Sequence, residues 1–183
     1  MLFRLLYGCG LRISEALALR VEDVDTQLGV LHIRDAKFGK ERLVPVHRHL
    51  ADHFREYLAV LPIAAKVSDH PAFPSSAGTA YTAGTVYRYF RCTLWSAGIS
   101  HGGRGRGPRL HDLRHTFAVH CLQRWVTEGT ELSVALPYLS AYLGHSGLKG
   151  TQHYLRLTAE LYPNIVATAE RHFASLLPGE ASQ

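Results

Sequence analysis

The residue types that carry chemistry gather in five short segments of the 183-residue chain. In chain order they are Gly10-Leu-Arg-Ile-Ser-Glu15, Asp35-Ala-Lys-Phe-Gly-Lys-Glu41, His111-Asp-Leu-Arg-His115, Leu143-Gly-His145 and Tyr154, nine residues after His145. Arginine and lysine bind anionic oxygens, histidine transfers protons near neutral pH, and tyrosine is a nucleophile once its hydroxyl is activated. The set therefore combines anion binding, proton transfer and a nucleophile.

The elements that must position these residues are predicted to be mostly helical. Met1 to Tyr7 is expected to form a helix that Gly8 and Gly10 break. Short apolar or amphipathic patterns predict further helices, which cover residues 14–20, 47–60, 85–97, 113–126, 133–142, 149–155 and 159–176. The apolar stripe of the helix over residues 85–97 is expected to contain Val86, Tyr89, Phe90 and Leu94.

A small antiparallel sheet is predicted near the start of the chain. Residues 30–33 and 42–46 are rich in β-branched and apolar side chains and predict two strands. The segment between them is short enough for a hairpin with Gly39 at the bend, and Pro45 favours an edge position for the second strand. Residues 23–26 are expected to form a turn.

Composition narrows the class of protein. Hydrophobic residues make up 46% of the chain and charged residues 19%, values typical of a folded domain and not of a disordered chain. A net charge of +5 favours a polyanionic partner, most commonly nucleic acid. Among the basic residues are 16 arginines and 4 lysines, so a reactive lysine must be Lys37, Lys40, Lys66 or Lys149.

Several other classes are disfavoured by the sequence. The three cysteines are far apart and form no CxxC pair, which argues against a disulfide framework or a zinc ribbon and favours the reducing cytoplasm. The apolar stretches are too short to span a membrane. The chain has no GxxxxGK[ST] phosphate loop and no evident acidic triad for two metals. His115, His120 and His153 lack the further ligands of a convincing coordination shell, so no metal site is expected.

Taken in order, the five segments resemble the tyrosine recombinase, or phage integrase, family. The resemblance extends from Tyr7 to about Leu157, and residues 150–158 are similar to the integrases of mobile elements. A single segment of the HxxR or LGH kind occurs often by chance, whereas five in this order form a specific signal. The resemblance implies the family's catalytic-domain fold, which is mainly α with a small antiparallel β-sheet (α+β).

This resemblance also implies an activity. The family breaks and rejoins DNA strands through a 3′-phosphotyrosyl intermediate and a Holliday junction, without metal, ATP or another cofactor. The implied partners are double-stranded DNA and, on DNA, three further copies of the chain in a homotetramer, with a monomer in the absence of DNA and no membrane. The implied location is the prokaryotic cytoplasm, in association with the nucleoid.

Each site residue takes an implied role from its match to the family. Arg12 and Arg114 would hold the nonbridging oxygens of the transition state, and Tyr154 would attack the phosphorus. His111 matches the base, and His145 matches a histidine that binds a phosphate oxygen. The remaining implied residues are Lys37 as general acid with Lys40 as its rival, Glu15 as an acid that orients the site, and Lys40, Arg104, Arg106 and Arg109 as DNA contacts.

Two alternatives concern the end of the chain. Tyr162 competes with Tyr154 as the nucleophile, but it opens an amphipathic helix and is expected to serve packing. The apolar face of that last helix either packs within the chain or docks on a neighbouring protomer, and it consists of Leu161, Ile165, Ala169 and Phe173.

The chain departs from the family pattern at its start. Family members carry a separate N-terminal domain that closes a clamp around DNA, so residues 1–183 are expected to be an N-terminally truncated catalytic domain that binds DNA weakly and with strong salt dependence. A noncatalytic DNA-binding remnant is a second hypothesis. A type IB topoisomerase is a third, and the mobile-element tail argues against it.

Overall fold

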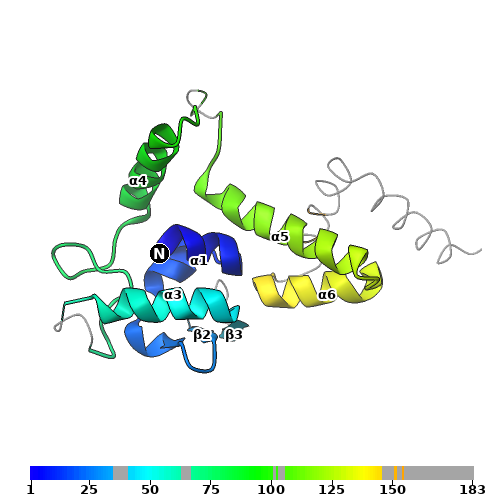
Figure 1. Cartoon of the computed structure of the whole chain (residues 1–183), viewed down its shortest axis with the longest axis horizontal. Coiled ribbons are helices and arrows are strands. Elements are labelled where there is room, and N and C mark those ends of the chain that lie inside the picture. Colours follow the sequence, from blue (N-terminus) through cyan, green and yellow to red (C-terminus); the bar gives the residue numbers. More distant parts are fainter. Residues whose placement is uncertain are drawn as a thin grey trace, which may run out of the picture. The chain divides into compact units, whose positions relative to one another are not determined.

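The computed structural model describes residues 1–34, 41–62, 67–100, 102, 106–145, 151 and 154. The chain divides into two compact units, Met1–Phe117 and Ala118–Gln183. Helix α5, Leu110–Thr127, contributes residues to both units. Most described elements are helices, and a three-stranded antiparallel sheet lies in the first unit, which confirms the predicted fold class (Figure 1).

Four α-helices precede α5 in the first unit. They are α1 (Leu2–Cys9), α2 (Ile13–Ala18), α3 (Arg48–Ala59) and α4 (Ala83–Ser96), each within three residues of its predicted bounds. Helix α1 packs against α2 and α3, and α2 packs against α4. The rings of Phe3 and Phe90 join α1 to α4 edge to face, with centroids 5.4 Å apart.

Gly8 does not break the first helix, in contrast to the prediction. It lies within α1, which ends at Gly10, where the backbone adopts the left-handed conformation at φ 59°. A Cβ atom at position 8 would lie 2.7 Å from Leu50 Cδ2, so glycine permits close approach of α3. Gly8 therefore allows close packing of two helices, whereas Gly10 allows the chain to turn.

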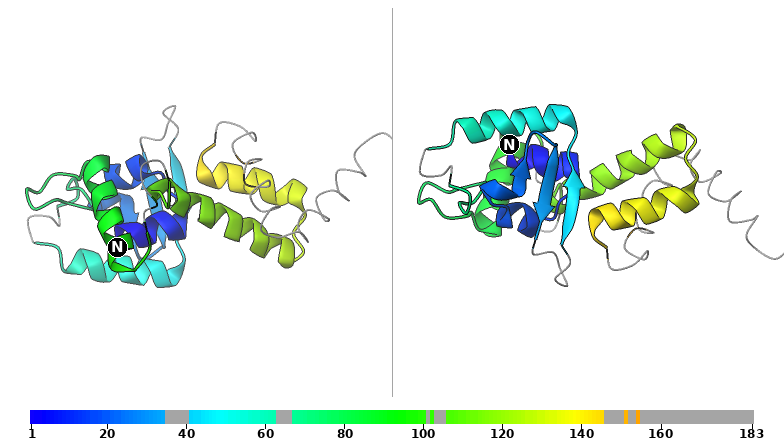
Figure 2. Two further views of the ribbon diagram at one scale, coloured as in Figure 1. Left: turned by 90° about the horizontal axis from the view of Figure 1, so that it is seen from above. Right: turned by 90° about the horizontal axis from the view of Figure 1, so that it is seen from below.

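The sheet has the order β1-β2-β3, with β1 at Val24–Asp25, β2 at Val30–Ile33 and β3 at Arg42–Pro45 (Figure 2). Both pairs are antiparallel, with Val24 opposite Leu31 and Ile33 opposite Arg42. Strand β3 is at an edge, as Pro45 predicted. The prediction of a turn over residues 23–26 is wrong. A 3₁₀ turn over Val21–Asp23 leads instead into strand β1. The sequence does not reveal β1, because a two-residue strand is too short to show an alternating pattern.

The core of the first unit joins the sheet and the helices through buried side chains. Leu31, Ile33 and Val44 bury one face of the sheet, while the ring of Phe54 on α3 stacks on Phe73 at a centroid distance of 5.5 Å. On α4 the predicted stripe is confirmed except for Tyr89, which is 48% exposed.

The second unit contains the later part of α5 and helix α6, Leu132–Leu143, joined by a turn at Gly129. Both helices carry buried apolar side chains, among them Val119, Leu122, Leu132 and Leu139. Residues 151 and 154 are helical, and the rest of the predicted helices over 149–155 and 159–176 lies outside the described residues. Tyr162 and the predicted apolar face of the last helix lie outside them as well.

No helix in the described part of the chain is long and apolar enough to cross a membrane. All three cysteines are described and are free thiols.

Candidate active site

The turn between α1 and α2 holds the first predicted site residue. After Gly10 reverses the chain, Arg12 occupies the position that caps the start of α2. Its backbone N–H donates to Glu15 Oε2 at 2.9 Å, so the glutamate satisfies a helix-start donor that would otherwise lack an intrahelical partner. Because Glu15 follows Arg12 by three residues, its side chain can reach back to the Arg12 backbone.

The Glu15 carboxylate also receives side-chain donors from two arginines. Arg12 Nη1 donates to Oε1 at 2.7 Å, while Arg42 from β3 donates Nη1 to Oε1 at 3.0 Å and Nη2 to Oε2 at 2.9 Å. Only 2% of the Glu15 side chain is exposed. A buried carboxylate of this kind requires such partners.

Arg114 completes this cluster from α5. Its side chain is 2% exposed, its Nη1 donates to the carbonyl oxygen of Gly10 at 2.6 Å, and the same nitrogen lies 3.9 Å from Glu15 Oε2. The structure therefore brings two predicted phosphate-binding residues, Arg12 and Arg114, to the carboxylate of Glu15, which was also predicted as a site residue. We refer to Arg12, Glu15, Arg42 and Arg114 as the arginine–glutamate cluster.

The ionisation of Glu15 reflects two opposed effects. Burial, the largest, acts to raise the pKa of its carboxyl group, but hydrogen bonds from Arg42 and Arg12 and the charge of Arg42 together outweigh it. The pKa of Glu15 consequently lies below its ordinary value, and the group is an anion at neutral pH. It balances one of the three positive charges around it.

His111 lies in the first turn of α5 and faces a cationic environment. Its ring stands edge to face with that of His115, at a centroid distance of 4.5 Å. His111 is exposed to solvent, yet neighbouring protein atoms displace part of the water around its ring. This desolvation, and then the positive charge of Arg114, lower the pKa of His111 from its ordinary 6.5, although Asp112 opposes them. His111 is therefore neutral at pH 7 and able to accept a proton.

The second unit brings together two further predicted catalytic residues, His145 and Tyr154. His145 follows the end of α6, where its backbone N–H donates to Ser140 O at 3.0 Å. Its Nδ1 is 2.9 Å from Thr151 Oγ1, and its ring stacks on that of Tyr154 with centroids 5.9 Å apart. Tyr154 is only 2% exposed.

The predicted DNA contacts are described only in part. Arg106 and Arg109 are exposed, and Arg109 caps α5, where its N–H donates to Asp112 Oδ2 at 2.8 Å and its Nη2 to Oδ1 at 3.0 Å. Lys37, Lys40 and Arg104 lie outside the described residues.

Arg42 is a member of the cluster that the sequence analysis missed, although the sequence holds a signal for it. Side chains alternate along a strand, so Arg42 falls on the same face of β3 as Val44, which is buried, and opposite to Leu43, which is 68% exposed. An arginine on a buried face needs a buried carboxylate as partner. Glu15 is such a partner.

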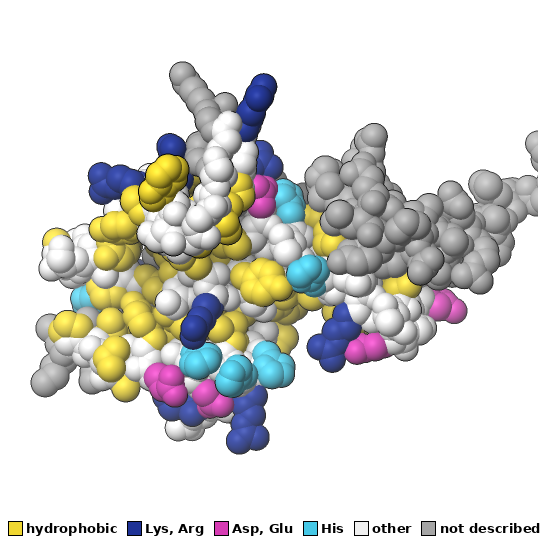
Figure 3. Space-filling model, turned by 45° about the horizontal axis from the view of Figure 1, so that its top comes forward, with side chains coloured by type: hydrophobic (Ala, Val, Ile, Leu, Met, Phe, Trp, Pro, Cys, Tyr) yellow, Lys and Arg dark blue, Asp and Glu magenta, His cyan; other side chains and the backbone are white. Residues whose placement is uncertain are grey.

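No group of three or more histidine, cysteine or acidic side chains is placed to hold a metal ion in the described ranges. Histidines do come close together on α3, where the rings of His49 and His53 lie 4.8 Å apart, and Figure 3 shows histidine side chains gathered on one face.

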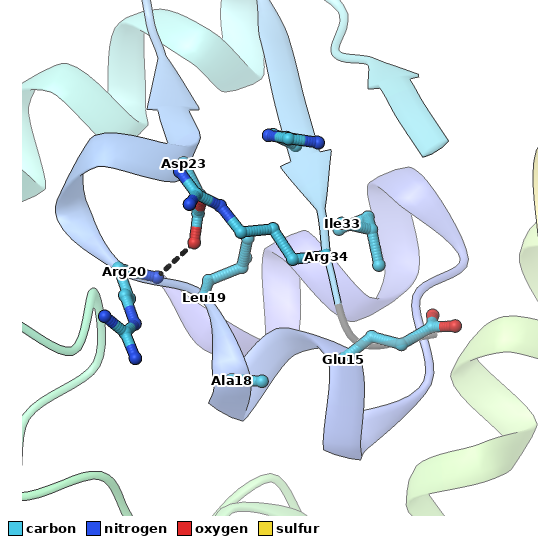
Figure 4. A pocket seen from close by; sticks show the side chains of 8 residues that line it. Glu15, Ala18, Leu19, Arg20, Asp23, Ile33 and Arg34 are labelled. Carbon is cyan, nitrogen blue, oxygen red and sulfur yellow. Dashed lines mark hydrogen bonds and ion pairs between the residues drawn. The ribbon is translucent and has the colours of Figure 1, made fainter. Parts of the chain in front are cut away.

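A cavity of about 170 Å³ lies beside the cluster, lined by residues from α2 to β2 (Figure 4). Two of its charged side chains, Arg34 and Asp23, pair with each other, and Arg34 also lies 3.2 Å from Glu22. Figure 4 shows the carboxylates of Glu15 and Asp23 on separate sides of the cavity. The cavity therefore separates two ionic networks.

Comparison with known proteins identifies the family. The model of the phage integrase family matches residues 1–160, and the chain belongs to this family, which confirms the resemblance found in the sequence. The chain is 38% identical over 174 residues to a Sinorhizobium fredii protein named as integrase/recombinase y4rB, covering 94% of this chain and 55% of that protein. It is 32% identical over 179 residues to tyrosine recombinase XerA of Pyrococcus furiosus, covering 96% of this chain and 56% of XerA.

Solved structures share the fold. A crystal structure of XerA recombinase aligns with a TM-score of 0.66 at 24% identity, over 86% of this chain and 54% of that chain. XerH recombinase bound to its difH substrate aligns with a TM-score of 0.61 at 24% identity, over 84% of this chain and 41% of that chain. The chain spans about half the length of the curated relatives it matches.

Proposed function

We propose that the chain is the catalytic domain of a site-specific DNA recombinase, which cleaves and rejoins DNA strands through a covalent phosphotyrosyl intermediate. The observation that carries the proposal is the arginine–glutamate cluster, in which Arg12 and Arg114 share one buried carboxylate. Guanidinium groups remain charged at all working pH values and bind phosphate oxygens with paired N–H groups. Membership in the phage integrase family, whose named relatives include tyrosine recombinases, supports the same activity.

In the proposed cleavage step, the Tyr154 hydroxyl attacks a DNA phosphodiester. The hydroxyl proton passes to His111, whose lowered pKa leaves its imidazole neutral and ready to accept it. A bond forms between the tyrosine oxygen and phosphorus while the bond from phosphorus to the 5′-oxygen breaks. Lys37 donates a proton to that leaving oxygen, and Lys40 is its rival for this role.

Charge develops on the nonbridging oxygens as phosphorus becomes five-coordinate. Arg12 and Arg114 stabilise that charge, which in many phosphoryl-transfer enzymes is the task of a metal ion. His145 adds a hydrogen bond to the same oxygens. Rejoining is the reverse reaction with the 5′-hydroxyl of a partner strand, and a second round resolves the Holliday junction between four protomers.

Lys40, Arg104, Arg106 and Arg109 are proposed to bind the neighbouring DNA phosphates. Binding by Arg109 requires that its guanidinium exchange at least part of its pairing with Asp112 for a phosphate. Because that pair is exposed, the exchange costs little.

Covalent capture on DNA tests this proposal. The chain is incubated with a pool of duplexes that carry a randomised central segment, adducts are recovered under denaturing conditions, and the enriched sequence is made into a nicked suicide substrate. We expect an adduct with the wild-type chain, none with Tyr154→Phe, and an undiminished yield with Tyr138→Phe, because Tyr138 is 69% exposed on α6. An adduct that survives Tyr154→Phe would overturn the assignment of the nucleophile.

A noncatalytic DNA-binding role is the second candidate. The burial of Tyr154 favours it, since a nucleophile that is 2% exposed must be uncovered before it can meet a phosphate. Sequence-dependent DNA binding without any adduct, from a chain that is folded, would support this role over catalysis.

A further inference from the structure

We propose that Arg42 is a positioning residue of the active site, which acts through Glu15 to hold Arg12 and Arg114 in the geometry that binds the reacting phosphate. This inference rests on the proposed function. Arg42 itself is not assigned a contact with DNA.

Arg42 binds the Glu15 carboxylate bidentately. Its two terminal nitrogens bind the two carboxylate oxygens separately, Nη1 to Oε1 at 3.0 Å and Nη2 to Oε2 at 2.9 Å. The terminal torsion of a glutamate side chain is broad in energy, so a single hydrogen bond leaves the plane of its carboxylate poorly defined. Two parallel bonds from a planar guanidinium define that plane.

The plane of the Glu15 carboxylate matters because both its oxygens also hold Arg12. Oε1 accepts from Arg12 Nη1 at 2.7 Å, and Oε2 accepts from the Arg12 backbone N–H at 2.9 Å. Oε2 is in addition the ion-pair partner of Arg114, at 3.9 Å. A rotation of the carboxylate would therefore shift the Arg12 guanidinium and change the field at Arg114 together.

The location of Arg42 makes it suited to support and not to substrate contact. Its side chain is 12% exposed, against 24% for Arg12. It arises from a strand whose backbone is fixed by pairing with Ile33 on β2. Arg42 therefore joins the sheet to the turn that carries Arg12.

Electrostatics support the same role. After burial, which acts to raise it, the hydrogen bond from Arg42 is the foremost influence on the pKa of Glu15 and helps to hold it below the ordinary value. Loss of Arg42 would make the Glu15 anion less stable at the centre of the cluster. A lysine at position 42 would keep the positive charge but could not bind both carboxylate oxygens in the same bidentate geometry.

The test compares cleavage with binding in the full chain. Single-turnover cleavage of the selected suicide substrate is measured for the wild type, Arg42→Gln, Arg42→Lys, Glu15→Gln and the double variant Arg42→Gln/Glu15→Gln. Arg55→Gln is the matched control, because Arg55 is a half-exposed arginine of the same unit that pairs with Asp52. DNA affinity at several salt concentrations is measured in a Tyr154→Phe background, so that binding is not complicated by cleavage.

If Arg42 positions the cluster, Arg42→Gln slows cleavage by about 10²-fold, the cost of a small misplacement of reacting groups. Arg42→Lys lies between it and the wild type, and Arg55→Gln cleaves normally. The double variant is no slower than Glu15→Gln alone, because Arg42 acts through Glu15. The salt dependence of binding is unchanged in Arg42→Gln.

Three results would overturn the inference while the wild type still forms its Tyr154 adduct. They are a wild-type rate for Arg42→Gln, additive losses in the double variant, and a salt slope reduced by about one unit, which would mean a direct phosphate contact. If Arg42→Gln does not fold, as judged by circular dichroism and melting, Arg42→Lys decides, since slow cleavage with an unchanged salt slope still requires positioning. If the wild type forms no adduct, the proposed function itself fails, and this inference with it.

Discussion

At the scale of single residues, the first consequence concerns His111. If its neutral imidazole is the base, the cleavage rate falls as the pH decreases through its pKa, which lies below 6.5 because of desolvation and the charge of Arg114. We therefore expect full activity at pH 7 and an acid limb centred below pH 6.5. Single-turnover rates across the pH range measure this limb.

The matched variants for this prediction lie on one helix. His111→Gln should lower the rate and remove the limb, whereas His120→Gln, an exposed histidine further along α5, should leave both unchanged. A limb that persists in His111→Gln would assign the titration to another group.

Glu15 leads to a prediction about stability. Its pKa is lowered in the folded state, so the stability it contributes is fully present above the unfolded value of about 4.5 and is lost as the pH falls through the lower folded value. Glu15→Gln leaves buried guanidinium groups without their counter-charge, and we expect it to destabilise the chain by about 3 kcal/mol at pH 7. Urea unfolding at pH 7 and at several acid pH values measures both effects.

The acid part of that experiment separates Glu15 from other carboxylates. Below pH 4.5 the wild type should lose stability more steeply than Glu15→Gln, because only the wild type has this buried group to protonate. Glu56→Gln, at a side chain that is 76% exposed, should follow the wild-type curve. Parallel curves for all three proteins would contradict the prediction.

The sequence predicted most residues of the described site but not the way they are connected. Arg12, Glu15 and Arg114 were found by their match to family motifs. Arg42 was missed because a motif records residue types and spacing, while the contact between Arg42 and Glu15 depends on which way a strand faces. The burial of Val44 and the exposure of Leu43 show which face of β3 carries Arg42. The sequence shows this only if one face of the sheet is already known to be buried.

At the scale of elements, Phe54 is the main anchor of α3. Its ring is 1% exposed, stacks on Phe73 at 5.5 Å and lies 6.0 Å from the ring of Tyr57. Phe54→Ala should cost about 3–5 kcal/mol through lost burial and the cavity left behind. Val60→Ala, at the 80% exposed residue that ends the same helix, should change stability by less than about 0.5 kcal/mol.

Urea unfolding of the two variants beside the wild type measures this difference. A loss below about 1 kcal/mol for Phe54→Ala would mean that neighbouring side chains refill the space.

Element prediction succeeded where local patterns decide and failed where distant packing does. The bounds of β2 and the start of β3 were predicted correctly, because β-branched runs bordered by turn residues are local signals. The role of Gly8 was not, since it depends on the approach of Leu50 from a helix far along the chain. Tyr89 fits the apolar stripe of α4 by periodicity, yet it is 48% exposed, since periodicity does not specify how wide the buried face is.

At the scale of the whole molecule, the net charge of +5 predicts how binding to DNA responds to salt. Figure 3 shows Lys and Arg side chains exposed at several separate places. Each phosphate neutralised releases counterions, so affinity should fall at least about tenfold between low and physiological salt. Fluorescence polarisation with a labelled duplex measures this dependence, and an affinity insensitive to salt would contradict it.

The shared helix α5 limits how the protein can be divided in experiments. The boundary between the two units falls between Phe117 and Ala118, in the middle of α5. A chain cut there would leave two helical fragments, each shorter than the roughly 12–15 residues that an isolated helix needs in water. Split-protein reporters and separate expression of the units should therefore place their break at Gly129 in the turn after α5, which keeps His111 and Arg114 on an intact helix.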